Sequence, residues 1–361
     1  MLEYIRPASL RLGDKLGRTI YNSQGNILIK SGISLTEKMI KNIQLQGYKG
    51  IYIYRIENTD RESIHIQEPV IDDYTTIKVI SILSRILNNK NIFTNPWDDN
   101  FTKCRQQLEE YVDEFYKIFI ERNVKEQLMF EMEDGRTNDN WIEYHSFNTM
   151  QLAMSIAIRL GCTETEVKGI GIAGLMHDVG KAKYPGLMNK KKLTDEEKIV
   201  LRTHPRIIFE ILTCLSGIYA STYCTYGCWQ SHELYDGTGY PIGLSDNKIT
   251  IFGYIVGVAS RFDNLVHITP FNDSPMTNNE ALEYLMGSNY YQIEVIKALT
   301  QIVSAYPVGM KVKLSNGESG LIISNNMSLP LRPNVSIGYK KINLASDDEY
   351  RNVTIQEVSK I

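Results

Sequence analysis

The sequence predicts a mostly α-helical protein with a small strand-containing module at each end. Short β-forming runs separated by turn residues occur near both termini, whereas apolar residues between positions 70 and 305 recur about every three to four residues. The 361 residues are enough for two or three domains. We therefore expect an N-terminal α+β accessory module over 1–65, a helical domain over 70–305 and a C-terminal β-rich extension over 306–361.

Short apolar runs near the N-terminus predict strands. Residues 19–21 and 27–29 flank the turn sequence Asn-Ser-Gln-Gly, which is typical of a β-hairpin. Residues 51–54, Ile-Tyr-Ile-Tyr, consist of β-forming side chains and predict a further strand. The charged and polar residues 57–62 then mark the expected end of this module.

Polar residues with the spacing of helix caps predict where helices begin. A Ser or Thr three residues before a Glu is the pattern of a capping box, and three such pairs are Ser34–Glu37, Thr163–Glu166 and Thr194–Glu197. Gly47 and Gly161 follow helical segments and are expected to end them, because glycine adopts the left-handed backbone of a helix C-terminus without strain.

The central segment carries the helical periodicity. One stripe of a single helix is expected to be buried: Leu108, Tyr111, Phe115 and Ile118. An apolar helix is also expected over 147–160. Beyond Pro307 the pattern returns to strands, since 312–314 and 320–323 flank Ser-Asn-Gly-Glu, and Asn-Gly is a strong hairpin signal. Residues 335–337 predict one more strand.

Composition narrows the class of protein. Lys and Arg total 39 and Asp and Glu total 42, so the net charge of −3 argues against a protein held on DNA by its overall field. There is no apolar run of the roughly 20 residues that a membrane span needs, and the first residues lack the pattern of a secretory signal. Five cysteines are an odd and sparse set for a disulfide scaffold. We expect a cytoplasmic protein.

Histidines are the most informative residues of the chain. There are six, and four of them fall in the helical segment: His145, His177, His204 and His232. His177 is followed directly by Asp178, and imidazole with carboxylate is a ligand set for iron, manganese or zinc. A carboxylate at this position can bridge two metals, and Lys181 is near enough in sequence to meet phosphate charge.

The spacing alone leaves a second interpretation open, because a buried histidine is more often a hydrogen-bonded core residue than a metal ligand. His65 and His267 are expected to be surface or local structural residues. Cys224 and Cys228 are four residues apart and are expected to be small apolar side chains of one helix face, since no second cysteine pair completes a zinc site. The glycine-rich segment 231–244 predicts an exposed turn and does not have the spacing of a P-loop.

Together these residues resemble the HD-GYP domain, a subfamily of the HD-superfamily phosphohydrolases. The resemblance covers roughly residues 143–272 and rests on motifs in a fixed order: His177-Asp178-x-Gly180-Lys181, His204-Pro205 and Asp236-Gly237-x-Gly239-Tyr240-Pro241. The segment 187–197 and both flanking modules are also similar to those of the family. The expected core is therefore an HD-type helical bundle.

The resemblance implies a bundle that holds two or three metal ions, usually iron or manganese, and that hydrolyses cyclic dinucleotides, chiefly cyclic di-GMP. The residues that match its metal ligands are His145, His177, Asp178, His204 and His232, with Asp178 as the bridge. Asp178 and Lys181 are the expected catalytic residues, with Lys181 near the scissile phosphate. The implied substrate loop, which is also a proposed docking surface for diguanylate cyclase domains, consists of Asp236, Gly237, Gly239, Tyr240 and Pro241.

The chain departs from the family pattern at its metal ligands. Ser231 stands where the family has a first histidine, Ser260 where it has an aspartate and Trp141 where it has a glutamate. The family's Arg-Pro-Tyr-Arg stretch is Thr-Pro-Phe-Asn at 269–272. A neutral hydroxyl is a weak ligand beside imidazole or carboxylate. We therefore expect one or two metal sites with an incomplete ligand set, completed by water and by Glu143 or Asp263.

Three functions remain open from the sequence. The first is an active cyclic dinucleotide phosphodiesterase with a reduced metal site. The second is a degenerate member that binds a cyclic dinucleotide or docks a partner without hydrolysis. The third is a dimerisation scaffold in which the histidines are remnants. We rank them in this order, because five ligand-type residues in register exceed what a scaffold requires, and a homodimer is left open.

Overall fold

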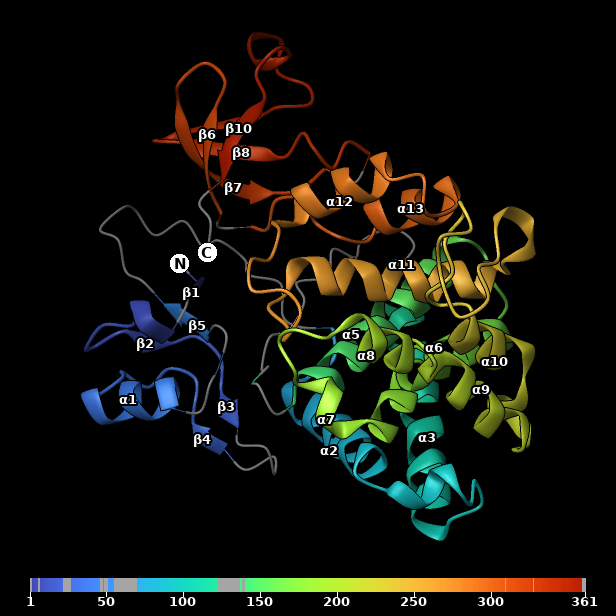
Figure 1. Ribbon diagram of the computed structural model, residues 1–361. Coiled ribbons are helices and arrows are strands. Elements are labelled where there is room, and N and C mark those ends of the chain that lie inside the picture. The colour runs from blue at the N-terminus through green and yellow to red at the C-terminus, as the bar shows by residue number, and fades with distance from the viewer. Residues whose placement is uncertain are drawn as a thin grey trace.

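The computed structural model describes residues 2–5, 7–21, 27–45, 48, 51–54, 70–122, 137, 140–308, 310–326 and 328–358. Helices fill the centre of the described chain, and small sheets lie toward both ends, which confirms the predicted mostly α-helical class (Figure 1).

The N-terminal module contains a small antiparallel sheet with the strand order β1-β5-β2. These strands are β1 (Leu2–Ile5), β2 (Lys15–Leu16) and β5 (Ile51–Tyr54), so the predicted strand at 51–54 is confirmed. The predicted hairpin is confirmed as β3 (Ile20–Tyr21) paired with β4 (Ile27–Ile29), and its turn lies outside the described residues.

The helix of this module, α1 (Glu37–Leu45), begins later than the capping pattern suggests. Thr36 supplies the cap, since its Oγ1 accepts a hydrogen bond from the backbone N–H of Met39 at 3.3 Å. The prediction of Ser34 as the cap is wrong because Ser34 is still in extended chain, where it pairs with Lys15. Gly47 and residues 57–62 lie outside the described residues.

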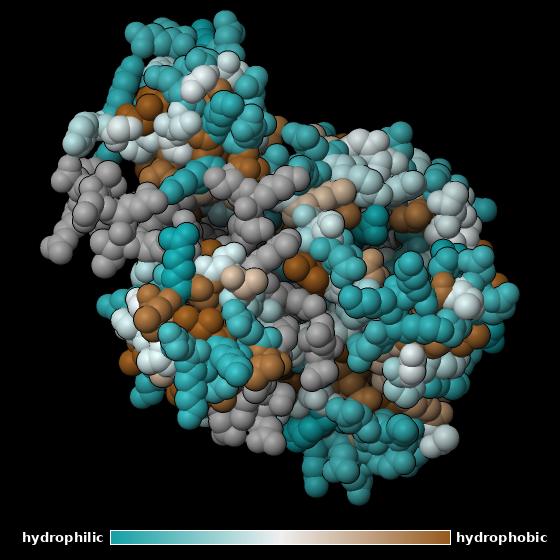
Figure 2. Space-filling view, turned by 60° about the vertical axis from the view of Figure 1, so that its left-hand side comes forward, coloured by the Kyte–Doolittle hydropathy of each residue, from teal (hydrophilic) through white to brown (hydrophobic). Residues whose placement is uncertain are grey.

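The N-terminal module has its own hydrophobic core. Leu16, Leu35, Ile43 and Ile53 belong to a cluster of buried side chains that is separate from the core of the helical part. Figure 2 shows hydrophobic side chains gathered on the face turned toward the viewer, where this module lies. Its strongly exposed aliphatic residues are Leu12, Ile27, Leu28, Ile33 and Leu45. These five side chains are therefore open to solvent on the surface of the module.

A second and larger core lies in the helical part, where α5 packs against α6 and α11. The helices of this part are α2 (Asp73–Leu87), α3 (Asp99–Glu121), α5 (Trp141–Arg159), α6 (Glu164–Met176), α7 (Pro185–Met188), α8 (Asp195–Leu201), α9 (His204–Thr213), α10 (Thr222–Trp229), α11 (Ile251–Val266), α12 (Asn278–Gly287) and α13 (Ile293–Thr300). The capping boxes at Thr163 and Thr194 are confirmed at the starts of α6 and α8. Gly161 has a φ of +81° just beyond α5.

Helix α5 is the centre of the bundle. Every residue from Trp141 to Ile158 is buried, including polar side chains such as Asn148 and Gln151. A helix that is buried on all sides is surrounded by other elements, so no face of α5 is left for solvent. The helix starts six residues before the predicted segment 147–160, and this extension carries His145.

The predicted stripe on α3 is partly wrong. Leu108 and Phe115 are fully buried, whereas Tyr111 and Ile118 are only half-buried. Val112 and Phe119 take the buried positions instead. The buried line thus follows steps of four, three and four residues, which is the spacing of one α-helical face.

The C-terminal part forms a five-stranded antiparallel sheet with the order β10-β6-β7-β8-β9 beside α12 and α13 (Figure 1). Its strands are β6 (Lys311–Leu314), β7 (Ser319–Ser324), β8 (Asn334–Ile337), β9 (Lys340–Asn343) and β10 (Ile355–Val358). The predicted hairpin at 312–323 is confirmed, and Gly317 in its turn has a φ of +88°. Apolar residues of the sheet, such as Leu314 and Ile322, belong to the same core as the helices. The exact limits of the three predicted regions stay predictions.

Candidate metal centre

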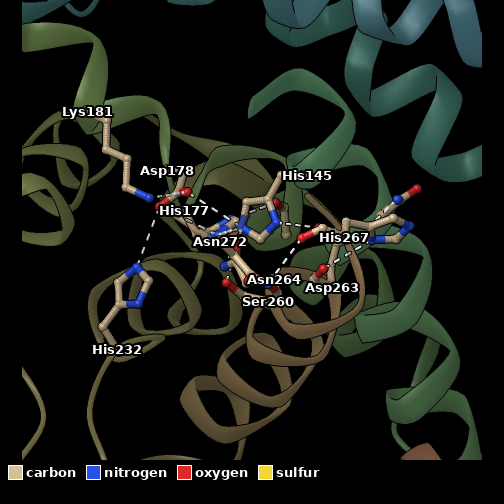
Figure 3. A network of polar contacts seen from close by, with 12 residues as sticks. His145, His177, Asp178, Lys181, His232, Ser260, Asp263, Asn264, His267 and Asn272 are labelled. Atoms are coloured by element: carbon tan, nitrogen blue, oxygen red, sulfur yellow. Dashed lines mark hydrogen bonds and ion pairs between the residues drawn. The ribbon is translucent and has the colours of Figure 1, made fainter. Parts of the chain in front are cut away.

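Six chemically active side chains from four helix ends or turns converge in the bundle, and all but His204 are labelled in Figure 3. His145 is on α5, and His177 and Asp178 follow the end of α6. Lys181 is in the 3-10 helix η3 (Val179–Lys183). His204 is the first residue of α9, and His232 lies in the turn after α10.

Two groups of ligand atoms share the carboxylate of Asp178. In each group the ligand atoms lie within 4.8 Å of one another; the groups are His145–His177–Asp178 and Asp178–His204–His232. We name the first the inner position, because its three side chains are fully buried, and the second the outer position, because its His232 side chain is 16% exposed. The structure thus brings together all five residues that the sequence predicts as ligands.

Close backbone packing places these residues. Gly174 of α6 packs against the backbone of Met150 on α5, and a Cβ there would lie 2.6 Å from the Met150 Cα. Gly180 packs against the carbonyl oxygen of His204 with no room for a Cβ. Glycine at these two positions therefore lets α6 and η3 approach the elements that carry the other histidines.

Hydrogen bonds fix the orientation of three imidazole rings. The Nδ1 of His177 is 2.9 Å from the Gly174 carbonyl oxygen, and the Nδ1 of His204 is 2.8 Å from the Leu201 carbonyl oxygen. The Nδ1 of His145 is 2.6 Å from Asp263 Oδ2. Carbonyl and carboxylate oxygens accept hydrogen bonds, so each Nδ1 carries the proton and each Nε2 presents a lone pair to the centre.

The residues present fit divalent metal ions. The Nε2 atoms of His145 and His177 are 3.2 Å apart, although neither has a proton to donate to the other. The Nε2 atoms of His204 and His232 are 3.0 Å apart, and His204 Nε2 is 3.1 Å from Asp178 Oδ1. Ligand atoms about 2.1 Å from one metal are typically about 3.0–3.4 Å apart. The structure therefore brings lone pairs together at the spacing that a shared cation requires.

Burial and charge keep these residues in the form that binds metal. Burial lowers the pKa of His177 to about 3 and that of His232 to about 4, and it also lowers the pKa of His204. Burial alone would raise the pKa of Asp178, but Lys181 and the surrounding imidazoles outweigh it and hold this pKa well below the usual range. At neutral pH these three imidazoles are thus neutral and the carboxylate is ionised, which are the ligating forms.

Asp263 lies behind His145, where it orients the ring. Its Oδ2 contacts His145 Nδ1, while its Oδ1 accepts a hydrogen bond from Asn148 Nδ2 at 2.9 Å and lies 3.0 Å from His267 Nδ1. His267 is buried there as a local structural residue, as predicted, and His65 lies outside the described residues. Asn148 belongs to none of the motifs in the sequence, although its position three residues after His145 is a usable signal.

The three residues that stand in place of the family's ligands make different contacts in the structure. Ser260 Oγ lies 3.2 Å from His145 Nε2, so this hydroxyl is at the centre. Ser231 Oγ instead donates to the Cys228 carbonyl oxygen at 3.0 Å. The Trp141 indole is buried, donates to Asn189 Oδ1 at 2.9 Å and meets Phe271 edge to face. Asn264, which sequence reasoning missed, lies one helical turn after Ser260 with its amide 3.5 Å from His145 Nε2.

The glycine-rich loop is tied to the metal centre. The Tyr240 ring stacks on His232 with centroids 4.8 Å apart and an angle of 11°, and its backbone N–H donates to the His232 carbonyl oxygen. The buried Glu233 carboxylate accepts three backbone hydrogen bonds of 2.8–3.0 Å from residues 242–244. The prediction of an exposed turn is therefore only partly right, since Asp236 is exposed but Gly237, Gly239, Tyr240 and Pro241 are half-buried. Cys224 and Cys228 are fully buried on α10.

The sequence is similar to known proteins over the helical part. Residues 120–292 match the family model of the HD domain. The chain is 29% identical over 204 residues to the cyclic di-GMP phosphodiesterase PA4108 of Pseudomonas aeruginosa. The aligned region is 56% of this chain and 49% of that protein. It is 37% identical over 132 residues to the cyclic di-GMP phosphodiesterase response regulator RpfG of Xanthomonas campestris, covering 36% of this chain and 34% of that protein.

A third relative covers more of the chain. The cyclic di-GMP phosphodiesterase of Thermotoga maritima is 28% identical over 251 residues, which is 66% of this chain and 64% of that protein. The chain thus spans less than two thirds of the length of each of these relatives. Among the described residues, the helices are all too short or too polar to cross a membrane. Residues 120–292 are thus similar to the HD domain, and they include the His177-Asp178, His204-Pro205 and Gly239-Tyr240-Pro241 motifs.

Proposed function

We propose that this protein is a metal-dependent phosphodiesterase that hydrolyses a cyclic dinucleotide, with cyclic di-GMP as the first candidate. One observation carries the proposal: four imidazoles surround the single carboxylate of Asp178, and the Lys181 ammonium group lies on the same carboxylate. The names of the three relatives support cyclic di-GMP as the substrate.

Bound metal ions would supply the reactivity that the side chains lack. Bound divalent ions act as Lewis acids toward a phosphodiester and make water a better nucleophile at neutral pH. Imidazoles with one carboxylate suit iron, manganese or zinc, and the HD-GYP motifs favour iron or manganese. His145, His177, Asp178, His204 and His232 would hold these ions.

Lys181 has a separate role in this proposal. Its Nζ lies 2.5 Å from Asp178 Oδ2, so its positive charge is at the centre rather than at the surface. An ammonium group there would contact phosphate oxygens and protonate the departing ribose oxygen. Tyr240 would keep the His232 ring in place through the stacking contact. Docking of diguanylate cyclase domains through residues 236–241 and a homodimer stay predictions.

The test is hydrolysis of cyclic di-GMP by protein purified without oxygen and supplied with ferrous iron or manganese. We expect linear dinucleotide or GMP from the native protein and no product from Asp178→Ala, both measured by chromatography. A folded native protein that loads metal without turnover would contradict the proposal. Binding of cyclic di-GMP under those conditions would favour the receptor function instead, because Ser231 and Ser260 are poor substitutes for charged or imidazole ligands.

A further inference from the structure

We propose that the two cation positions differ in affinity: the outer position binds one divalent ion tightly, and the inner position binds a second ion weakly. This inference rests on the metal centre of the proposed function and adds an order of loading to it. Three differences between the two positions carry it: the state of each Asp178 oxygen, the donors around His145 and the charge of the surrounding ligands.

The two oxygens of Asp178 are in different states. Oδ2 already carries the Lys181 ammonium group at 2.5 Å. Oδ1 is buried and has no hydrogen-bond donor among the described residues. Of the three imidazoles around it, two belong to the outer position, with Nε2 at 3.1 Å (His204) and 3.5 Å (His232), and one to the inner position, with Nε2 at 3.6 Å (His177). A buried carboxylate oxygen without a donor is costly unless a cation compensates it. The outer position therefore gains most from an ion.

The inner position is already supplied with donors. Ser260 Oγ lies 3.2 Å from His145 Nε2, and the Asn264 amide lies 3.5 Å from the same atom (Figure 3). Both can donate a hydrogen bond to this lone pair. An ion that enters here must break the hydrogen bonds from Ser260 and Asn264 before His145 Nε2 can coordinate it.

Charge adds to the difference. Ser260 and Asn264 lie one turn apart on α11 and offer only neutral oxygens to the inner position. An ion there shares its one carboxylate with the outer ion and repels the Lys181 ammonium group, which is bonded to that carboxylate. Asp178 is the one carboxylate among these ligands, and the Asp263 carboxylate reaches the inner position only through the His145 ring. The direct ligands therefore do not neutralise two divalent ions and an ammonium group, so the second ion binds weakly.

Titration of the metal-free full chain with Mn²⁺ tests this order, with free Mn²⁺ followed by electron paramagnetic resonance. We expect one tightly bound ion per chain and a second ion that binds at least tenfold more weakly. His204→Ala should abolish the tight binding of Mn²⁺, whereas His145→Ala should abolish only the weak binding. Circular dichroism of each variant shows that it is folded.

Two further variants address the inner position directly. Ser260→Asp adds a carboxylate next to His145. It should raise the Mn²⁺ affinity of the inner position at least tenfold without changing the affinity of the outer position. Lys181→Met removes the competing ammonium group and should act in the same direction. Ser274→Asp makes the same chemical change at an exposed residue and should leave both affinities unchanged.

Two results would overturn the inference and leave the proposed function standing. The first is a titration in which both ions bind with equal affinity. The second is tight binding that is retained in His204→Ala but lost in His145→Ala. If the folded native protein bound neither Mn²⁺ nor ferrous iron, the proposed function itself would fail, and the inference with it.

Discussion

The two ends of the metal centre hold the same kind of ligand by different means. Inside the bundle, the His145 ring is fixed by Asp263, which comes from another helix and is itself held by Asn148. Near the surface, the His232 ring stacks on Tyr240. The loop that carries Tyr240 is held by backbone hydrogen bonds to the Glu233 carboxylate. A hydrogen bond between two helices therefore orients the buried ligand, whereas a locally folded loop orients the exposed one.

The largest effect is expected from the residue that both ends share. Asp178→Ala removes the only carboxylate common to both groups and leaves four imidazoles facing Lys181. We expect loss of metal binding and of any turnover, measured by metal analysis and by cyclic di-GMP hydrolysis. Asp348→Ala, at an exposed residue far along the chain, is the control and should retain both. Unchanged metal content in Asp178→Ala would refute the site.

The buried end is tested by Asp263→Asn. The amide keeps the size of the side chain but removes the negative charge that holds the proton on His145 Nδ1. Loss of such an orienting group typically costs about 10- to 100-fold in metal affinity, and we expect this loss at the inner position. Titration with Mn²⁺ measures it. An unchanged titration would mean that helix packing alone fixes the His145 ring.

The exposed end is tested by a pair of variants at Tyr240. Tyr240→Ala removes the ring that stacks on His232, and aromatic contacts of this kind are worth about 0.5–1.5 kcal/mol. We expect metal affinity at the outer position to fall about two- to tenfold. Tyr240→Phe keeps the ring and should restore native affinity. If both variants behaved alike, stacking would not be the cause.

The smallest effect on metal binding is expected from a change at the start of α6, far from the metal centre. Thr163→Ala removes the hydroxyl that accepts from the backbone N–H of Glu166, and loss of such a cap costs about 1 kcal/mol. The thermal midpoint should fall by about 2–4 °C, while Mn²⁺ affinity stays native. A loss of affinity in this variant would show that the end of α6 that carries His177 is sensitive to its distant start.

Local sequence patterns predicted local structure well. The capping boxes at Thr163 and Thr194 mark the starts of α6 and α8, and Asn-Gly marks the C-terminal hairpin. The five ligand-type residues also converge as the motifs imply. Capping and turn signals depend on neighbours in sequence, so they can be interpreted without knowing the fold.

Contacts between distant parts of the chain could not be predicted in this way. His145 and Asp263 are 118 residues apart, and no local pattern marks them as partners. The polar residues of α5 gave no sign that the whole helix is buried, because polarity is normally a signal of exposure. The inward turn of Tyr240 was missed because glycine-rich sequences indicate a turn but not what the turn packs against.

The shared core of the bundle and the C-terminal sheet has a consequence during synthesis. Leu344 and Val353 belong to the same hydrophobic cluster as the residues of α5 and α6. When His232, the last histidine of the centre, is added to the growing chain, the 121 residues up to Val353 are still to be made. The bundle that supports the metal ligands therefore reaches its full packing only after Val353 has been made, and a fragment ended at residue 305 would leave apolar surface of the helices uncovered.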